Sequence, residues 1–95
     1  MAEGRTWAFV TSHGAVLIEV ARRPDATVRE IAERVGLTER QAHRVLSDLV
    51  KEDYVVRARV GRRNHYRVHH DRPMRHAIFA DRQIGELLAT LLPKP

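Results

Sequence analysis

The sequence predicts a mostly helical α+β domain in which three helices are followed by a β-hairpin and a last helix. Apolar residues recur at helical spacing in three stretches before residue 53, and the spacing changes to two between residues 55 and 69. A leucine-rich stripe near the end returns to helical spacing. With 95 residues, 43% of them hydrophobic, the chain can bury one core but not two, so we expect a single domain over 1–95.

The first predicted helix spans 12–22. Thr11 and Ser12 precede the apolar stretch 15–21, and Ser or Thr at that place is a typical N-cap. Two arginines favour the C-terminus of this helix, and Pro24 ends it. Because most of its circumference is apolar, we expect this helix to lie at the centre of the domain.

Two capping boxes predict the next two helices, at 28–35 and 39–52. In each box a threonine N-cap is followed three residues later by Glu or Gln. The boxes are Thr27 with Glu30 and Thr38 with Gln41. Both segments then carry one apolar stripe at helical spacing, which is the face we expect to be buried. The stripes are Val28, Ile31, Ala32 and Val35, and then Ala42, Val45, Leu46, Leu49 and Val50.

The segment 55–69 alternates with a period of two, which predicts a β-hairpin. Its two arms are separated by 61–64, four residues of turn material that begin with Gly and end with Asn. We expect one apolar face toward the core, with Arg and His on the other. The residues expected on the apolar face are Val56, Ala58, Val60, Tyr66 and Val68.

A last helix is expected within 74–92, after Pro73 breaks the second strand. Its stripe is at helical spacing, and two alanines extend the stripe backwards. The stripe is Ile84, Leu87, Leu88, Leu91 and Leu92, and the alanines are Ala77 and Ala80.

The charge is unevenly distributed along the chain. Between Tyr54 and His76, seven arginines oppose one aspartate, so that window carries +6, whereas the remainder carries −1 of the total of +5. A local cationic patch on a nearly neutral body indicates a polyanionic partner, most commonly nucleic acid. A membrane surface is less favoured because the patch lacks an amphipathic helical pattern. Genomic codon bias toward arginine is the alternative explanation.

Other classes of protein are excluded by what the sequence lacks. It has no cysteine, no apolar run of membrane-spanning length, and no apolar signal segment in its first ten residues, so we expect a cytoplasmic protein without disulfides. We expect no enzyme and no cofactor, since we find neither a Gly-rich phosphate loop nor paired carboxylates nor an activated nucleophile. The histidines from His69 to His76 lack the spacing of metal ligands on one helix, so we expect no metal site.

The segments 28–35 and 39–52 resemble a helix-turn-helix. A small residue lies where the second helix would cross the first, Gly follows in the turn four residues later, and apolar residues fix the crossing. These are Ala32, Gly36, Leu37, Ala42 and Val45. The basic hairpin resembles the wing of a winged helix-turn-helix. Over about residues 7–92, the order of elements resembles bacterial transcription factors of the MarR and ArsR types.

This resemblance implies a double-stranded DNA-binding transcriptional regulator, a dimeric repressor that reads a palindromic operator. The helix 39–52 would enter the major groove, and the hairpin 55–69 would lie on the minor groove or the backbone. Threonine N-caps would contact phosphates. The residues expected to bind DNA are Thr27, Thr38, Arg40, Gln41, His43, Arg44, Ser47, Lys51, Arg57, Arg59, Arg62, Arg63, Asn64 and Arg67.

The same resemblance implies a homodimer formed by 7–11 and 74–92. The leucine stripe is long for a domain whose core already uses three helices. Two recognition helices about 34 Å apart would then read the two halves of a palindrome. The residues expected at the interface are Trp7, Phe9, Val10, Ile84, Leu87, Leu88, Leu91 and Leu92.

Three further points are left open by the sequence. A winged-helix module that binds an acidic protein is the main alternative, although such a module would expose apolar residues on its recognition helix. RNA binding is less favoured, because few aromatic residues lie near the hairpin. An unidentified effector is possible, but the chain is shorter than typical MarR proteins, whose added helices flank a ligand cleft.

Overall fold

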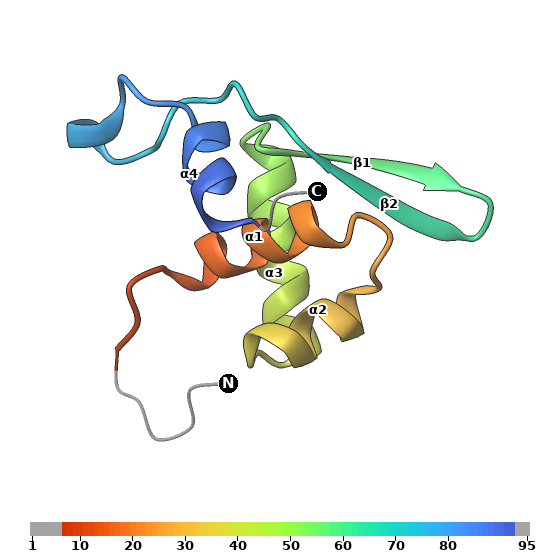
Figure 1. Ribbon diagram of the computed structural model, residues 1–95. Helices are drawn as coiled ribbons and strands as arrows, with labels where there is room; N and C mark the ends of the chain where they lie inside the picture. Colours follow the sequence, from red (N-terminus) through yellow and green to blue (C-terminus); the bar gives the residue numbers. More distant parts are fainter. Residues whose placement is uncertain (1–6, 93–95) are drawn as a thin grey trace.

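The computed structural model describes residues 7–92; residues 1–6 and 93–95, which the prediction includes in the same domain, lie outside the described part (Figure 1). Helices and a hairpin follow one another in the predicted order. The elements are α1 (Ser12–Arg22), α2 (Val28–Val35), α3 (Glu39–Lys51), β1 (Val55–Val60), β2 (Arg63–Val68), the 3₁₀ turn η1 (Ala77–Phe79) and α4 (Ile84–Leu91).

The first three helices begin where their caps predict. The Thr11 hydroxyl accepts a hydrogen bond from the Gly14 N–H at the start of α1. Both capping boxes are formed, so each threonine hydroxyl accepts from the backbone N–H three residues later. Gly36 ends α2 with φ +77°, a left-handed conformation that glycine adopts without steric cost.

The core lies where α1, α2 and α3 meet, with α1 at its centre (Figure 1). The predicted stripes of α2 and α3 face inward: Ile31, Ala32, Ala42 and Leu46 are among the buried residues. Helix α1 also contacts β2 and α4, so it touches the other three α-helices and the hairpin. The prediction of a central first helix is therefore confirmed.

The hairpin turn is shorter than predicted. Val60 pairs directly with Arg63, so the turn consists of Gly61 and Arg62 alone, and Asn64 belongs to β2. Gly61 has φ +63°, the left-handed conformation that two-residue hairpin turns require. The prediction of a four-residue turn was wrong. Arg63 and Asn64 are paired with residues of β1, although residues of their type are common in turns.

The predicted inward face is right for the second strand, where Tyr66 and Val68 are buried, but wrong for the first strand. Residues paired across an antiparallel hairpin share a face, and Tyr66 pairs with Arg57 while Val68 pairs with Val55. Val55, Tyr66 and Val68 are buried against the helices, whereas Ala58 and Val60 are exposed on the opposite face. Arginines therefore occupy both faces of the wing.

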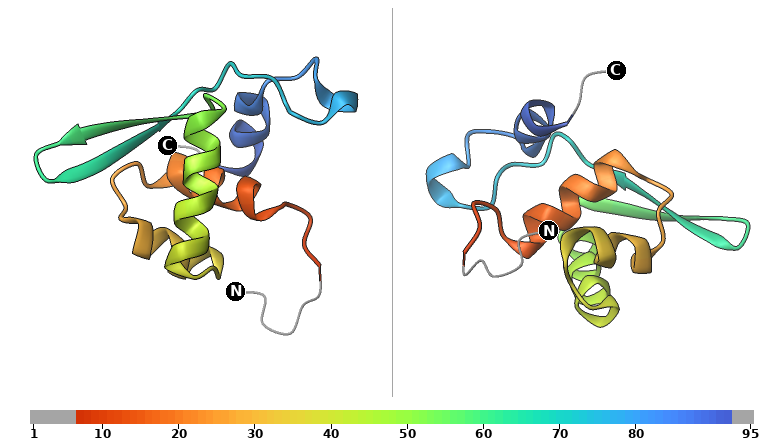
Figure 2. Two further views of the ribbon diagram at one scale, coloured as in Figure 1. Left: turned by 180° about the vertical axis from the view of Figure 1, so that it is seen from behind. Right: turned by 60° about the horizontal axis from the view of Figure 1, so that its bottom comes forward.

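Only the base of the hairpin is held by the body. The Tyr66 N–H donates to the Pro24 carbonyl at 2.9 Å, which ties β2 to the link between α1 and α2. The Tyr54 hydroxyl donates to the Pro73 carbonyl at 2.6 Å. Beyond these anchors the strands extend away from the helices as an isolated ribbon (Figures 1 and 2).

The last helix lies within the predicted range but begins only at Ile84, so the backward extension of its stripe through the alanines is wrong. The chain doubles back after Pro73, which forms a β-bridge with Gln83, and the Met74 N–H donates to the Arg82 carbonyl at 2.8 Å. Ala77 and Ala80 lie in and beside the 3₁₀ turn rather than on the helical stripe. The alanines do not extend the helix, because the backbone on either side of them forms the hydrogen bonds of the returning loop instead of helical ones.

Helix α4 packs on the domain through part of its leucine stripe. Ile84 and Leu88 are buried in the core of this chain, so their side chains are not available on its surface. Gly85 permits this packing: a Cβ there would lie 2.7 Å from the His70 carbonyl oxygen. None of the helices within residues 7–92 combines the length and apolarity that a membrane crossing requires.

Candidate nucleic-acid interface

The exposed face of α3 carries the predicted basic residues. Arg40, Arg44, Ser47 and Lys51 all lie on the surface, opposite the buried stripe of the same helix. One acid of this helix is held by a hydrogen bond from another element: His13 Nε2 lies 2.8 Å from Asp48 Oδ2. The helix therefore presents a predominantly cationic face.

The arginines of the chain divide into two groups by their partners. One group forms ion pairs with acids: Arg22, Arg23, Arg29, Arg34, Arg75 and Arg82. The other group forms none within residues 7–92: Arg40, Arg44, Arg57, Arg59, Arg62, Arg63, Arg67 and Arg72. Apart from Arg72, which lies over the Tyr54 ring, every arginine of this second group is a predicted DNA contact.

The wing distributes its cations around a narrow ribbon. Arg57 and Arg59 share the face of Tyr66, whereas Arg63 and Arg67 share the opposite face, and Arg62 lies in the turn. All five are exposed. This arrangement allows the ribbon to meet phosphates on both sides at once.

The capping threonines lie at the exposed starts of α2 and α3. Thr27 and Thr38 are exposed, and each hydroxyl oxygen already accepts a backbone hydrogen bond at 3.1 Å. The Thr38 hydroxyl hydrogen can still be donated to a phosphate, whereas the Thr27 hydroxyl is engaged with the Glu30 carboxyl. Gln41 is more restricted, because its Oε1 accepts from the Thr38 N–H at 2.9 Å. Only its amide N–H groups remain for a base.

His43 and Asn64 complete the predicted DNA set. His43 is exposed, and its Nε2 lies 4.0 Å from Glu39 Oε2, one turn earlier on α3. Asn64 is half-buried, opposite Arg59 near the tip of the wing. Asn64 also lines a small cavity, about 210 Å³, between the wing tip and the start of α2.

Glu30 lies beside this cavity at the first turn of α2. Hydrogen bonds from the backbone and the hydroxyl of Thr27 hold the pKa of Glu30 below its usual range, and the charges of Arg63 and Arg23 lower the pKa further. An ionised glutamate at this position also interacts favourably with the positive N-terminal end of the helix dipole.

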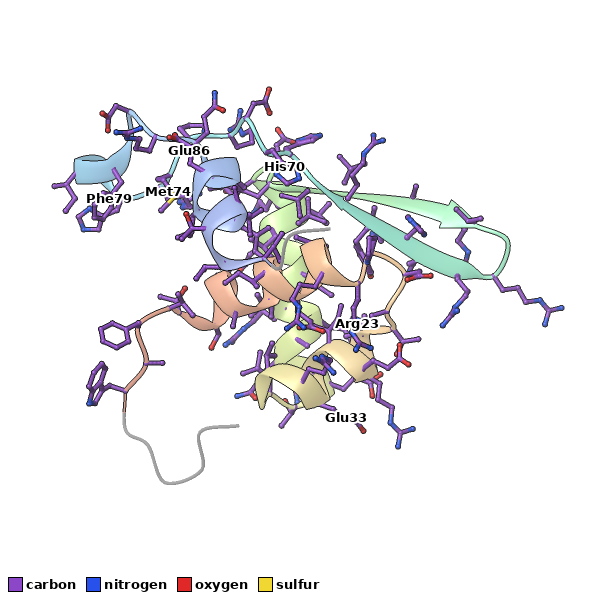
Figure 3. The ribbon with its side chains drawn as sticks, viewed as in Figure 1. Arg23, Glu33, His70, Met74, Phe79 and Glu86 are labelled. Atoms are coloured by element: carbon purple, nitrogen blue, oxygen red, sulfur yellow. The ribbon has the colours of Figure 1, made fainter. Side chains whose placement is uncertain are left out.

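A buried acid joins α1 to α2, and the sequence patterns did not reveal it. Glu19 is 5% exposed, and its Oε2 lies 2.6 Å from Arg34 Nε, although this close contact lacks hydrogen-bond alignment. Arg23 Nε is 3.7 Å from the same oxygen. Figure 3 shows Arg23 between the two helices. The available signal was a single glutamate within the apolar run of the first helix.

Apolar residues are exposed at two places outside the basic surface of α3 and the wing. Trp7 and Phe9, 68% and 95% exposed, stack edge to face with ring centroids 5.0 Å apart. Ile78 and Phe79 are exposed on the η1 loop, where Figure 3 shows Phe79 away from the three-helix body. This second group was missed because the segment was predicted as a continuous helix.

The remaining predicted interface residues lie in and around α4 and before α1. Val10 is 38% exposed and Leu91 48%, so both side chains reach the surface. Leu87 and Leu92 are half-buried, and Leu92 packs against the core.

A larger cavity of about 440 Å³ lies between the start of α1 and the C-terminal half of α3. Ion pairs form part of its wall: His13 with Asp48, and Arg75 NH1 with Glu52 Oε1 at 3.0 Å. Leu49 and Tyr54 supply apolar surface. The described part of the chain contains no group of three side chains placed to hold a metal ion.

The family model for the MarR family matches residues 10–63, more than half of the chain. This chain belongs to the MarR family. The matched region contains all three helices of the core, β1 and the turn of the wing. The resemblance to MarR-type regulators predicted from the sequence is confirmed. No curated protein matches the chain by sequence.

A solved structure supports the same assignment. This MarR-family chain is similar to the PcaV transcriptional regulator from Streptomyces coelicolor, solved in complex with its natural ligand, with 27% identity and a TM-score of 0.56. The similarity covers 85% of this chain but only 57% of the PcaV chain. The winged-helix fold is thereby confirmed, and this chain spans little more than half the length of the PcaV chain.

Proposed function

We propose that this MarR-family regulator binds double-stranded DNA sequence-specifically, as a homodimer that represses transcription from a palindromic operator. Helix α3 enters the major groove, where Arg40 and Arg44 can each bind guanine O6 and N7. The wing lies along the minor groove or backbone. Repression follows from occlusion, because a protein bound across the operator blocks access of the polymerase to the promoter.

The observation that carries this proposal is the division of the arginines. Six arginines elsewhere in the described chain form ion pairs, three of them with Glu19, whereas the arginines of α3 and the wing have no ion-pair partner in residues 7–92. A genomic codon bias toward arginine would not explain why the arginines that lack ion pairs gather on α3 and the wing. A phosphate backbone supplies the missing counter-charges.

The proposal is tested by fluorescence anisotropy at about 150 mM salt. The full chain is titrated with DNA from upstream of its own gene and with a scrambled duplex of the same composition. We expect nanomolar affinity for the first and binding about 1,000-fold weaker for the second. A reporter behind the upstream DNA should fall when the protein is expressed, and a rise would contradict repression.

Binding that is weak and equal for both duplexes calls for selection from a random duplex pool. If the pool yields no enriched sequence, sequence-specific DNA binding is wrong. The winged-helix module for an acidic protein would then be the better account, and capture of an acidic partner that competes with heparin would support it.

We also propose that a small anionic effector binds the cavity between α1 and α3. The PcaV structure contains a natural ligand, and here Arg75 offers a cationic group and His13 a ring nitrogen beside the C-terminal half of the recognition helix. An anion that competes with Glu52 for Arg75 would disturb the contact between that loop and α3. In a panel of aromatic and aliphatic carboxylates, at least one should weaken DNA binding by the native protein but not by Arg75→Ala. If none does so, the effector proposal fails.

A further inference from the structure

We propose that Val60, beside the tip of the wing, contacts DNA through its apolar side chain and contributes affinity that does not depend on salt. This inference rests on the proposed DNA-binding function. It adds a contact residue to the wing that the pattern of basic residues does not identify, and it places the tip inside a groove rather than along the phosphates.

Val60 has no protein surface to pack against. It is 63% exposed at the end of β1, on the face of the ribbon that it shares with its partner Arg63. The body covers only the base of the hairpin, where Val55 and Tyr66 are buried. Figure 2 shows the distal half of the ribbon extending away from the helices in both views. The valine is therefore an apolar group directed at a partner or at water.

The tip is a tight turn with open space around it. Its turn has only two residues, and a Cβ built on Gly61 would meet no atom within 4 Å. The minor groove of B-form DNA is about 6 Å wide and admits only slender elements. The four-residue loop expected from the sequence would have been broader, so the two-residue turn is what makes this entry feasible.

The surroundings of Val60 select DNA over a hydrophobic protein surface. Arg59, Arg62 and Arg63 lie within three residues of it, and none forms an ion pair in the described chain, although Arg63 lies close enough to Glu30 for its charge to lower the pKa of that carboxyl. An apolar protein patch would have to bury these unpaired guanidinium charges, which is costly. The minor groove presents anionic phosphates at its rims and apolar deoxyribose edges on its walls. Val60 can pack on a sugar while its neighbours reach the rims.

The test separates ionic from non-ionic binding. The probe is the tightest duplex that the full chain enriches from a random 30-base-pair pool, measured over a series of salt concentrations. Val60→Thr keeps the branched shape but replaces a methyl by a hydroxyl. We expect the affinity to fall about three- to tenfold at every salt concentration, the size expected when one apolar group loses a dry contact. The slope of log K against log salt should not change, because no phosphate contact is lost.

Two variants provide the comparison. Arg62→Ala should make the slope shallower by about 0.9, the value for one phosphate contact. Val56→Thr is the matched control, the same substitution on the same strand and face but nearer the body. It should leave the affinity unchanged, with urea unfolding used to confirm that both valine variants remain folded.

A change confined to the minor groove gives a second readout. Replacing adenine by 2,6-diaminopurine throughout the probe adds an amino group in that groove only. The native protein should lose affinity, and Val60→Thr should lose less, so the two changes should not be additive.

The outcomes distinguish a failure of the Val60 contact from a failure of the proposed DNA-binding function. If Val60→Thr binds the probe as the native protein does at every salt concentration, the inference is wrong and the DNA-binding function stands. A shallower slope for this variant also overturns the inference, because ionic contacts would then have moved. If no duplex is enriched, the function itself fails.

Discussion

Arg44 lies at the middle of the exposed face of α3, one turn after Arg40, with no ion pair in the described part of the chain. Its fork of N–H donors matches the two acceptors of guanine in the major groove. Arg44→Ala should cost about 1–3 kcal/mol at the cognate site and relax the preference at one base position. Anisotropy against a panel of single-base operator variants measures both effects.

The control for Arg44 is an arginine with the same charge but a protein partner. Arg82 NH1 lies 2.8 Å from Glu86 Oε2 at the start of α4, away from the recognition helix. Arg82→Ala should leave both affinity and base preference unchanged. If Arg82→Ala weakened binding as much as Arg44→Ala, net charge rather than base contact would explain the loss.

Gly85 shows how one backbone contact can hold an element. Its N–H donates to the His70 carbonyl at 2.8 Å, and a Cβ would lie 2.7 Å from that oxygen. Gly85→Ala should therefore lower the free energy of unfolding by about 1–3 kcal/mol, because backbone must shift to relieve the overlap. Gly14→Ala is the matched control within α1, where the nearest atom is the Cβ of Val10 at 3.3 Å, in the segment before the helix, so the overlap is much smaller. Urea unfolding should show it neutral or stabilising.

At the scale of the element, the capping boxes connect local sequence to pH. The pKa of Glu30 is held below its usual range by its hydrogen bonds with Thr27. A carboxyl whose pKa is lowered in the folded state adds stability that is fully present above its unfolded pKa, about 4.3, and is lost as the pH falls through the folded value. Glu30→Gln keeps an acceptor for the Thr27 N–H, as Gln41 does in α3, but removes the charge.

We therefore expect Glu30→Gln to be less stable than the native protein at pH 7, with the difference vanishing in acid. Urea unfolding at a series of pH values from 7 to 3 measures it. Glu33→Gln is the control, since Glu33 lies on the same helix without a backbone hydrogen bond. A difference for Glu30→Gln that stayed constant with pH would show that the charge plays no part in the cap.

At the scale of the whole molecule, the dimer proposal depends on which apolar residues remain exposed. Trp7 and Phe9 are exposed beside α1, whereas Ile84 and Leu88 belong to the core. The double variant Trp7→Ala with Phe9→Ala should shift the protein from dimer to monomer in sedimentation experiments. It should also lose the advantage of a palindrome over a half-site, because two linked recognition helices bind better than one.

The matched control for this variant replaces two apolar residues elsewhere on the surface. Ile78→Ala with Phe79→Ala removes similar exposed apolar area from the η1 loop. It should leave the dimer intact. A native protein that sediments as a monomer at concentrations that saturate the palindrome would contradict the proposed dimer.

The sequence by itself determined the elements whose signals are local. Helices α1 and α2 have the predicted bounds, and α3 ends one residue earlier than predicted. Caps, Gly36 and the apolar stripes act within a few residues of each other, so no distant contact could overrule them. The solvent exposure of Arg40 and Arg44 followed from the same helical period.

The tertiary structure decided what depends on contacts between distant segments. The register of the wing follows from pairing between strands and from the anchor at Pro24, so composition alone misplaced Val56, Ala58 and Val60. Helix α4 begins only at Ile84, because Pro73 and Gln83 pair across a returning loop that helical spacing cannot reveal. Ion pairing likewise had to be seen in space, since whether an arginine is neutralised depends on which acid the fold brings beside it.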